Sequence, residues 1–353
     1  MKCLPDPSFW RGRRVLLTGH TGFKGAWLAL WLNEMGAQVT GLALAPDEAP
    51  NLFTLANVAS HAQSYFGDVR DATTVRAAFD AGQPDIIIHM AAQALVRRSY
   101  REPVDTFATN VMGTVNVLEA ARLKQDLQAC LIVTSDKVYE NDGAGAPFAE
   151  GDRLGGHDPY SASKAAAEIV TMSYRRAFWS GVVAKPATAR GGNVIGGGDF
   201  SEDRIVPDVW RAHRARHPLL LRYPDATRPW QHVLDCLCGY LVYAERLAQG
   251  AVAEHALNFG PREKQGLAVR ELVTAMQAAI GASEGWRPAP GPLPQEMPAL
   301  ALDCEKAEAA LGWRSRLDAR AAIDWTAAWY QAFAAGEDAS TVTRAQIRRY
   351  IGA

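Results

Sequence analysis

The chain has 353 residues, of which 48% are hydrophobic and 21% are charged. This composition is typical of globular proteins with a sizeable core, so it excludes disordered, collagenous and coiled-coil chains. Lys and Arg number 37 against 38 Asp and Glu, a net charge of −1. There is therefore no overall field to recruit nucleic acid or an anionic membrane surface. At about 100–200 residues per domain, the length predicts two domains, or one large α/β body with a lobe.

The cysteines and the first residues indicate a reducing compartment. The five cysteines are odd in number and scattered, and Cys236 and Cys238 lack the two-residue gap of a zinc or thioredoxin pair. The start of the chain has no apolar core of signal-peptide length, and no run approaches the ~20 apolar residues of a membrane span. We therefore expect a cytoplasmic protein with no membrane partner and no bound metal.

Apolar runs and helical patterns alternate along the chain. Strands are predicted at residues 14–18, 38–44, 64–66, 85–89, 130–134 and 181–185. Helices are predicted at 23–35, about 103–123, 160–176, 269–280, 304–311 and 319–333. This alternation predicts an α/β fold, a Rossmann-type doubly wound parallel sheet with a smaller mixed α/β C-terminal lobe. We expect residues 1–188, with 230–258 returning to them, to form the sheet domain, and 189–229 with 259–353 to form the lobe.

Three glycines separate the first predicted strand from the first predicted helix, with the spacing Gly19-x-x-Gly22-x-x-Gly25. Glycines at such a turn let the backbone approach a pyrophosphate, which the helix N-terminus attracts. The candidate dinucleotide contacts in this segment are Gly19, His20, Thr21, Gly22, Phe23, Lys24 and Gly25.

Acidic residues follow the second predicted strand at Asp47 and Glu48, and no basic residue follows closely. A carboxylate at this position usually binds the adenosine ribose, so NAD is favoured over NADP. Asp68 and Val69, after the third strand, are candidates for the adenine edge. Asp68 could also be a turn residue without a ligand.

Tyr160 and Lys164 lie four residues apart at the start of a predicted helix, and therefore on one face of it. A fixed ammonium near a phenol favours the phenolate, which can accept a proton. In isolation this pair could be a surface tyrosine beside an exposed lysine. The glycine turn in the same chain favours the catalytic interpretation.

Together these motifs resemble those of the extended short-chain dehydrogenase/reductase family, over nearly the whole chain. HMAAQ at 89–93, Asn110 before Gly113-Thr114, and LGW at 311–313 extend the likeness. The resemblance implies that NAD is also contacted by Ala91, Ala92, Gln93, Asn110 and Thr134, besides Tyr160 and Lys164.

Within the family, four segments resemble the nucleotide-sugar 4,6-dehydratases that act on CDP-glucose. They are TGHTGFKG at 18–25, TSDKVYEN at 134–141, ARGGNVIGGGD at 189–199 and RPWQHV at 228–233. The resemblance implies an NAD-dependent hydro-lyase that converts CDP-glucose, or a related nucleotide sugar, to a 4-dehydro-6-deoxy sugar for deoxysugar biosynthesis. Alternatives are a 4-epimerase or dehydratase of the same family for UDP-, dTDP- or GDP-sugars, and a non-catalytic NAD-binding regulator.

The resemblance also assigns roles at the reaction centre. Tyr160 would take the proton of the sugar 4-hydroxyl, with Lys164 holding the nicotinamide ribose. Ser135 would hydrogen-bond the same sugar oxygen, and Thr134 is the second candidate. Asp136 would protonate the departing 6-hydroxyl. Lys137, where dTDP- and GDP-linked relatives have Glu, would remove the carbon-5 proton or stabilise the enolate, and both roles stay open.

Substrate-binding candidates lie mostly in the later part of the chain. Guanidinium groups match phosphate oxygens, so Arg204 and Arg228 are candidates for the pyrophosphate. Asn193, Arg97, Ser99 and His232 are candidates for the sugar, phosphate or cofactor side, although each of the six could be structural. The resemblance further implies a homodimer or higher homo-oligomer through residues 104–123 and 162–176, unless those apolar faces belong to the core.

Overall fold

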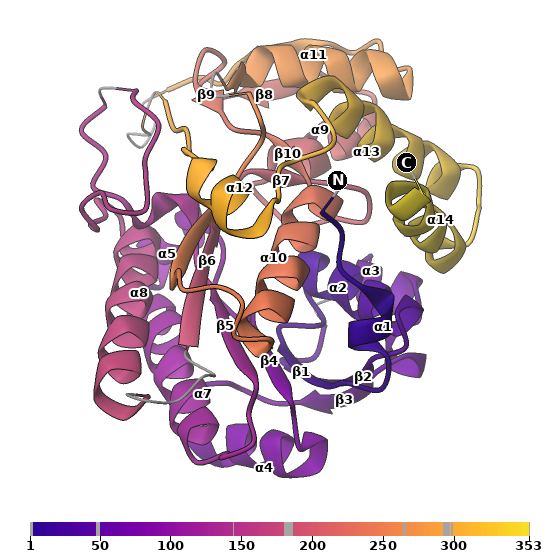
Figure 1. Ribbon diagram of the computed structural model, residues 1–353. Helices are drawn as coiled ribbons and strands as arrows, with labels where there is room; N and C mark the ends of the chain where they lie inside the picture. The colour runs from indigo at the N-terminus through magenta and orange to yellow at the C-terminus, as the bar shows by residue number, and fades with distance from the viewer. Residues whose placement is uncertain are drawn as a thin grey trace.

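The computed structural model describes residues 3–46, 50–143, 145–179, 186–263, 266–291, 297 and 299–352. Over these residues, seven strands form a central sheet (Figure 1). In chain order they are β1 (Arg14–Thr18), β2 (Gln38–Ala43), β3 (Gln63–Phe66), β4 (Ile86–His89), β5 (Ala129–Val133), β6 (Pro186–Gly191) and β11 (Ala256–Phe259).

The strands lie in the order β3-β2-β1-β4-β5-β6-β11, and every neighbouring pair is parallel. Successive strands are added to one side of β1 as far as β3 and to its other side from β4 onward. This switch in strand order lies between β1 and β4, where Thr18 lies opposite His89. A crevice at the carboxyl ends of the strands is expected at such a switch, and it is where ligands bind in this class of sheet. The doubly wound parallel sheet predicted from the sequence is confirmed.

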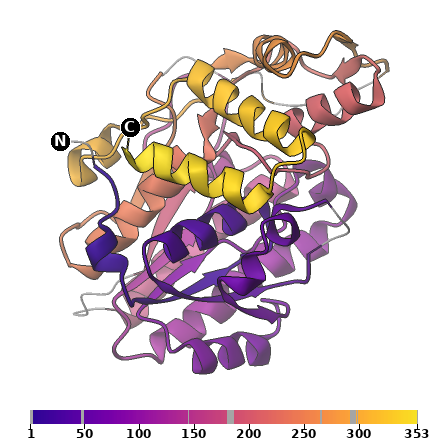
Figure 2. The ribbon, with the colours of Figure 1, turned by 90° about the vertical axis from the view of Figure 1, so that its right-hand side faces the viewer.

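Helices cover both faces of the sheet (Figures 1 and 2). One face is covered by α2 (Phe23–Glu34) and α10 (Val233–Ala248), and the other by α4 (Ala72–Gly82), α7 (Gly113–Arg122) and α8 (Pro159–Phe178). Successive residues of a strand point to opposite faces. Accordingly, Leu131 packs in the core beneath α10 and Ile132 in the core beneath α7. Shorter helices are α1 (Pro7–Trp10), α3 (Leu52–Leu55), α5 (Val96–Arg101) and α6 (Pro103–Phe107).

A second group of elements lies over the carboxyl ends of the strands, with α13 and α14 in yellow (Figure 2). Its helices are α9 (Ile205–Ala215), α11 (Val269–Ile280), α12 (Glu305–Leu311), α13 (Ala319–Ala334) and α14 (Ala339–Gly352). Its short strands are β7 (Val194–Ile195), β8 (Leu219–Leu221), β9 (Thr227–Arg228), β10 (Gln231–His232), β12 (Leu267–Ala268) and β13 (Trp286–Pro288). The indole of Trp27 on α2 donates to the Gly197 carbonyl (2.9 Å), which joins this lobe to the sheet body.

Some elements differ from the sequence-based expectation. The helix expected at 103–123 is α6, a π-helical turn (Ala108–Met112) and α7 in succession. The strand expected at 181–185, like Asp47 and Glu48, lies outside the described residues. β6 spans Pro186–Gly191, so the boundary expected at 188 falls inside a strand. Among the described residues, no helix combines the length and apolar character needed to cross a bilayer.

Candidate active site

The backbone of the glycine turn packs closely between α2 and the end of β4. Gly19 has φ +78°, and a Cβ there would lie 2.8 Å from the Ala91 backbone nitrogen. A Cβ on Gly25 would lie 2.0 Å from the Gly19 carbonyl oxygen. Gly22 is the N-cap of α2 and supplies no side-chain hydrogen bond. Because no N-cap side chain satisfies the first N–H groups of α2, this helix end suits an anion such as a diphosphate.

The side chains of the turn point in different directions. The His20 ring is buried against Gly41, with Nε2 3.0 Å from the Ser64 hydroxyl, and burial lowers its pKa to about 4. The Thr21 hydroxyl donates to the Leu44 carbonyl (3.0 Å), and Phe23 contacts the Gly196 backbone. His20 is therefore a neutral packing group.

The segment after β4 is fixed beside the glycine turn by buried hydrogen bonds. The Thr18 hydroxyl lies 2.7 Å from His89 Nδ1 and accepts from the Ala91 backbone nitrogen at 3.1 Å. The Asn110 side chain accepts from the Gln93 backbone nitrogen (2.8 Å) and donates back to the Gln93 carbonyl (3.0 Å). The segment with the predicted contacts Ala91, Ala92 and Gln93 is thus held, together with Asn110, at the carboxyl end of β4, and its contact with a cofactor stays a prediction.

Asp68 and Val69 follow β3 at the same edge of the sheet. The Arg70 guanidinium donates to the Asp68 carboxylate (2.6 Å) and lowers its pKa. Val69 is buried against Gly113 at the start of α7. The structure therefore makes Asp68 an ionised, Arg-paired acceptor, and its adenine contact stays a prediction.

Tyr160 and Lys164 meet the end of β5 from the first turns of α8. The helix begins directly before them, because Asp158 accepts from the Ser161 backbone nitrogen (3.0 Å) and Pro159 occupies the first turn. The Lys164 ammonium donates to the Val133 carbonyl (3.1 Å), and the Tyr160 side chain is close enough to Ser135 for that hydroxyl to lower the pKa of Tyr160. Both side chains are buried.

The residues after β5 form a compact polar cluster. The Ser135 hydroxyl donates to Asp136 Oδ1 (3.0 Å) and accepts from the Lys137 backbone nitrogen (3.2 Å). Asp136 Oδ2 accepts from Asn193 Nδ2 (2.8 Å). The Lys137 ammonium lies 3.8 Å from Asp136 Oδ1. The five residues predicted to be catalytic therefore converge at one place.

Burial and neighbouring groups shift the pKa values of Tyr160 and Lys164 in opposite directions. Burial lowers the pKa of Lys164 to about 7, with a further lowering by Lys24 and an opposing effect of Glu168. Burial raises the pKa of Tyr160, and the hydrogen bond with Ser135 lowers it. The free phenol is therefore protonated at neutral pH, and positive charge nearby is what favours its ionisation.

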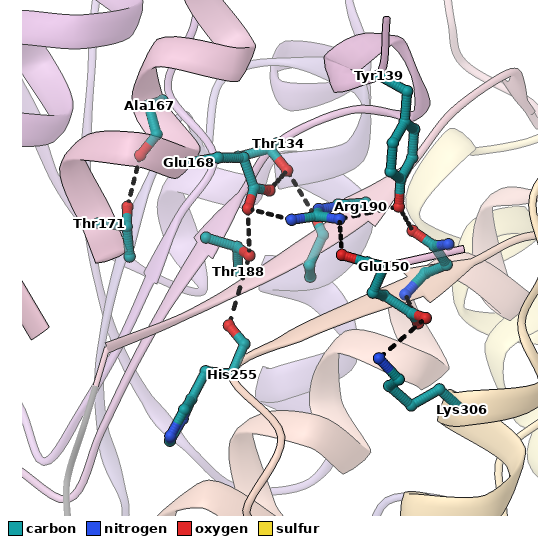
Figure 3. Close-up of polar contacts among 12 residues, drawn as sticks. Thr134, Tyr139, Glu150, Ala167, Glu168, Thr171, Thr188, Arg190, His255 and Lys306 are labelled. Carbon is teal, nitrogen blue, oxygen red and sulfur yellow. Dashed lines mark hydrogen bonds and ion pairs between the residues drawn. The ribbon is translucent and has the colours of Figure 1, made fainter. Parts of the chain in front are cut away.

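A buried network behind the cluster holds the end of β5 in place (Figure 3). The Thr134 hydroxyl donates to Glu168 Oε1 (2.5 Å), and Thr188 and Arg190 each donate to Oε2 (2.8 Å). Arg190 also donates to the Tyr139 hydroxyl (2.9 Å). Thr134 is thus bonded to Glu168, whereas the neighbouring hydroxyl of Ser135 donates to Asp136.

The sequence interpretation missed Glu168 and Arg190. A signal for Glu168 was present, because it follows Lys164 by four residues on the same helix face. Arg190 lies in β6, where every residue is buried, and a charge in such a strand requires a partner.

Of the substrate-binding candidates, Asn193 and Arg204 lie beside the cluster. Asn193 contacts Asp136. Arg204 lies 3.8 Å from the Asp199 carboxylate, and its charge lowers the pKa of Tyr160.

The other substrate-binding candidates have protein partners elsewhere. Arg97 pairs with Asp203, and Arg228 donates to the Thr227 carbonyl (2.8 Å). The Ser99 hydroxyl donates to the Val96 carbonyl within α5 (2.6 Å). His232 is buried between two indoles of the core, Trp27 and Trp325, and caps α10. The structure does not bring Ser99 or His232 to the cluster, and a substrate role for each of these residues stays a prediction.

The known proteins that this chain resembles are nucleotide-sugar dehydratases and epimerases. Residues 16–326 match the protein family described as GDP-mannose 4,6 dehydratase. The chain is 40% identical to the CDP-glucose 4,6-dehydratase of Salmonella typhimurium, over 99% of each chain. It is 30% identical to the dTDP-glucose 4,6-dehydratase of Xanthomonas campestris pv. campestris, over 89% of this chain and 92% of that one. The crystal structure of a Thermus thermophilus UDP-glucose 4-epimerase in complex with NAD matches with a TM-score of 0.77 at 27% identity, covering 89% of this chain and 98% of that chain.

Proposed function

The chain belongs to the GDP-mannose 4,6 dehydratase family, and from that membership we propose that it is an NAD-dependent nucleotide-sugar 4,6-dehydratase acting on CDP-glucose. The product is CDP-4-dehydro-6-deoxy-D-glucose. The substrate assignment is supported by the 40% identity to the Salmonella CDP-glucose enzyme over 99% of both chains. The observation that carries the reaction type is the convergence of Asp136 and Lys137 with Tyr160 and Lys164 at the end of β5.

The crevice between β1 and β4 fits NAD. Gly19 and Gly25 leave no room for a side chain, so the backbone of the turn and the uncapped first turn of α2 face a diphosphate directly. Bound NAD⁺ would supply the hydride chemistry of the reaction, which takes a hydride from sugar carbon 4 and places it on carbon 6. Lys164 holds the nicotinamide ribose, and the sheet body with α10 and β11 forms the cofactor domain.

Each protein group of the cluster then handles a proton or a charge. Tyr160 accepts the proton of the 4-hydroxyl, and Lys164 favours the phenolate that does so. The ketone at carbon 4 acidifies the proton on carbon 5. Lys137 removes this proton or stabilises the enolate that its removal leaves. Asp136 protonates the departing 6-hydroxyl so that it leaves as water. A 4-epimerase needs only the first of these steps, so the presence of Asp136 and Lys137 favours a dehydratase.

The first experiment compares CDP-, UDP-, dTDP- and GDP-glucose with the purified protein. We expect CDP-glucose to give the 4-dehydro-6-deoxy sugar, detected by its absorbance in alkali and by mass spectrometry. Deuterium placed on carbon 4 should reappear on carbon 6. Formation of only a galactose-configured product would show a 4-epimerase and overturn the proposal.

A second experiment separates the roles of Lys137. In Lys137→Ala, oxidation of the 4-hydroxyl should proceed while elimination slows, so reduced nicotinamide accumulates. Lys124→Ala is the matched control, because Lys124 follows α7 and pairs with Asp126. An equal loss in both steps would remove Lys137 from the elimination.

The chain also presents an apolar face suited to a second copy of itself. Val104 on α6 is 82% exposed, Met112 50% and Ile169 on α8 51%, and α6 packs against α8. Exposed apolar side chains gathered on neighbouring helices mark an interaction surface. A homodimer through this face should be converted to a monomer by Ile169→Glu, measured by light scattering. A wild-type monomer would contradict it.

A further inference from the structure

The two residues that act in the proposed elimination lie in a short segment after β5. This elimination segment begins at Thr134 and ends at Tyr139, and Asp136 and Lys137 lie between them in a 3₁₀ turn. Hydrogen bonds from both of its ends lead to one buried side chain, Arg190 of β6 (Figure 3). A single guanidinium therefore fixes the segment on either side of the reacting pair.

The first end of the segment is fixed through Glu168. The Thr134 hydroxyl donates to Glu168 Oε1 (2.5 Å), and Arg190 Nη2 donates to Oε2 of the same carboxylate (2.8 Å). The side chains of Glu168 and Arg190 are both buried. Loss of either partner would leave a buried charge unpaired, so the geometry of this pair is strongly held.

The second end is bonded to Arg190 directly. Nη1 donates to the Tyr139 hydroxyl (2.9 Å), and the guanidinium carbon lies 5.1 Å from the centre of the Tyr139 ring. Nη1 also donates to the Glu150 carbonyl (3.2 Å), and the Tyr139 hydroxyl donates to Asn258 Oδ1 on β11 (2.6 Å). Because a guanidinium is a rigid planar fork, these bonds hold Tyr139 at a set distance from the Thr134 end.

Asp136 and Lys137 depend on this support to different degrees. The Asp136 carboxyl has anchors outside the segment, because Asn193 Nδ2 donates to Oδ2 (2.8 Å) and a Cβ on Gly192 would lie 2.0 Å from the carboxyl carbon. The contacts of Lys137 lie within the segment. Its backbone nitrogen donates to the Ser135 hydroxyl (3.2 Å), and its ammonium lies 3.8 Å from Asp136 Oδ1. The place of the Lys137 ammonium therefore follows the backbone of the segment.

We propose that Arg190, through its bond to Tyr139, is a positioning residue that holds Lys137 at carbon 5 of the sugar. This inference rests on the proposed function, in which Lys137 removes the carbon-5 proton or stabilises the enolate. Both roles need close contact with the sugar, and a misplacement of about 1 Å costs about 10²-fold in rate. Tyr160 and Lys164, which serve the oxidation, belong to α8. Loosening the Tyr139 end should therefore slow the elimination and spare the oxidation.

Tyr139→Phe tests this, because it removes the bond to Arg190 and keeps the ring. In single turnovers of NAD-loaded protein with CDP-glucose, the absorbance of reduced nicotinamide rises with oxidation and decays with elimination and hydride return. We expect the decay to slow about 10-fold or more and the rise to stay within about twofold. Tyr243→Phe is the matched control and should keep both rates. It removes another buried hydroxyl, which donates to the Glu254 carbonyl (2.7 Å) before β11, at the opposite end of the sheet.

A double variant shows whether Tyr139 acts through Lys137. If it does, Tyr139→Phe should slow the decay no further in protein that already carries Lys137→Ala, because the two substitutions then remove the same interaction. The decay is measured only in molecules that have completed the rise, so it reports folded, loaded protein. A merely structural role for Tyr139 would lower stability without changing the ratio of the two rates.

Arg190→Lys is the second variant. It keeps a positive charge beside Glu168 but loses the fork, so it should reproduce the slow decay of Tyr139→Phe. An unchanged decay in either variant, equal slowing of rise and decay, or a full further slowing in the double variant would overturn the inference. Failure of the wild type to convert CDP-glucose would instead remove the proposed function itself.

Discussion

The ammonium of Lys24 lies 5.7 Å from the centre of the Tyr240 ring, although Lys24 belongs to the first turn of α2. A cation at a helix N-terminus is opposed by the helix dipole, and burial and the charge of Arg204 lower the pKa of Lys24. The contact with an aromatic face offsets part of this penalty. Lys24 thus brings a second ammonium into the region of Lys164, whose pKa it lowers.

Lys24→Met should extend activity to higher pH. Burial and the charge of Lys24 lower the pKa of Lys164 to about 7, and the charge of Glu168 opposes them. Removing the positive charge of Lys24 raises the pKa of Lys164, so Lys164 keeps its charge to higher pH. The alkaline fall of kcat/KM, measured between about pH 6 and 10, should move upward. Lys124→Met is the control, and an unmoved or lowered alkaline limb in Lys24→Met would contradict the coupling.

Gly25→Ala and Gly22→Ala should differ sharply in stability. A Cβ on Gly25 would overlap the Gly19 carbonyl oxygen at 2.0 Å, whereas one on Gly22 would lie 3.5 Å from the same atom. We expect Gly25→Ala to lower the free energy of unfolding by about 2 kcal/mol or more, as overpacking does, and Gly22→Ala to lower it by about 0.5–1 kcal/mol, because Gly is preferred to Ala at an N-cap. Urea denaturation without NAD measures both, and equal losses would refute the close packing of the turn.

The sequence predicted the parts of the site that depend on short spacings. The glycine turn, the pair Tyr160 and Lys164, and the segment 134–137 carry their pattern within a few residues. Helix α10 was not predicted, because all but two of its 16 residues are buried. It therefore has no polar stripe to mark it as a helix. The burial of His232 and the pairing of Glu168 with Arg190 depend on contacts between distant segments, and one sequence does not show these.

Glu168→Gln should destabilise the protein more than removal of both charges. The side chains of Glu168 and Arg190 are 3% and 5% exposed, so the variant leaves a buried guanidinium without its counter-ion. Breaking such a pair costs about 3–5 kcal/mol, whereas replacing both members is much less harmful. The double variant Glu168→Gln, Arg190→Met should therefore unfold at a higher urea concentration than Glu168→Gln alone. The reverse order would show that the pair contributes little.

Acid should destabilise the protein through three buried histidines, His20, His89 and His232. Burial lowers their pKa values to about 4, about 3 and about 3, well below the ~6.5 of an unfolded chain. As the pH falls below about 6.5, the unfolded chain takes protons that the folded protein does not, so the free energy of unfolding decreases. At pH 5 each histidine contributes a loss of about 2 kcal/mol.

Urea denaturation at about pH 7.5 and 5 measures the difference. This difference should shrink in His89→Asn and stay whole in the exposed-site control His217→Gln. If unfolding were equally favourable at both pH values, the three rings would not be buried in their neutral form.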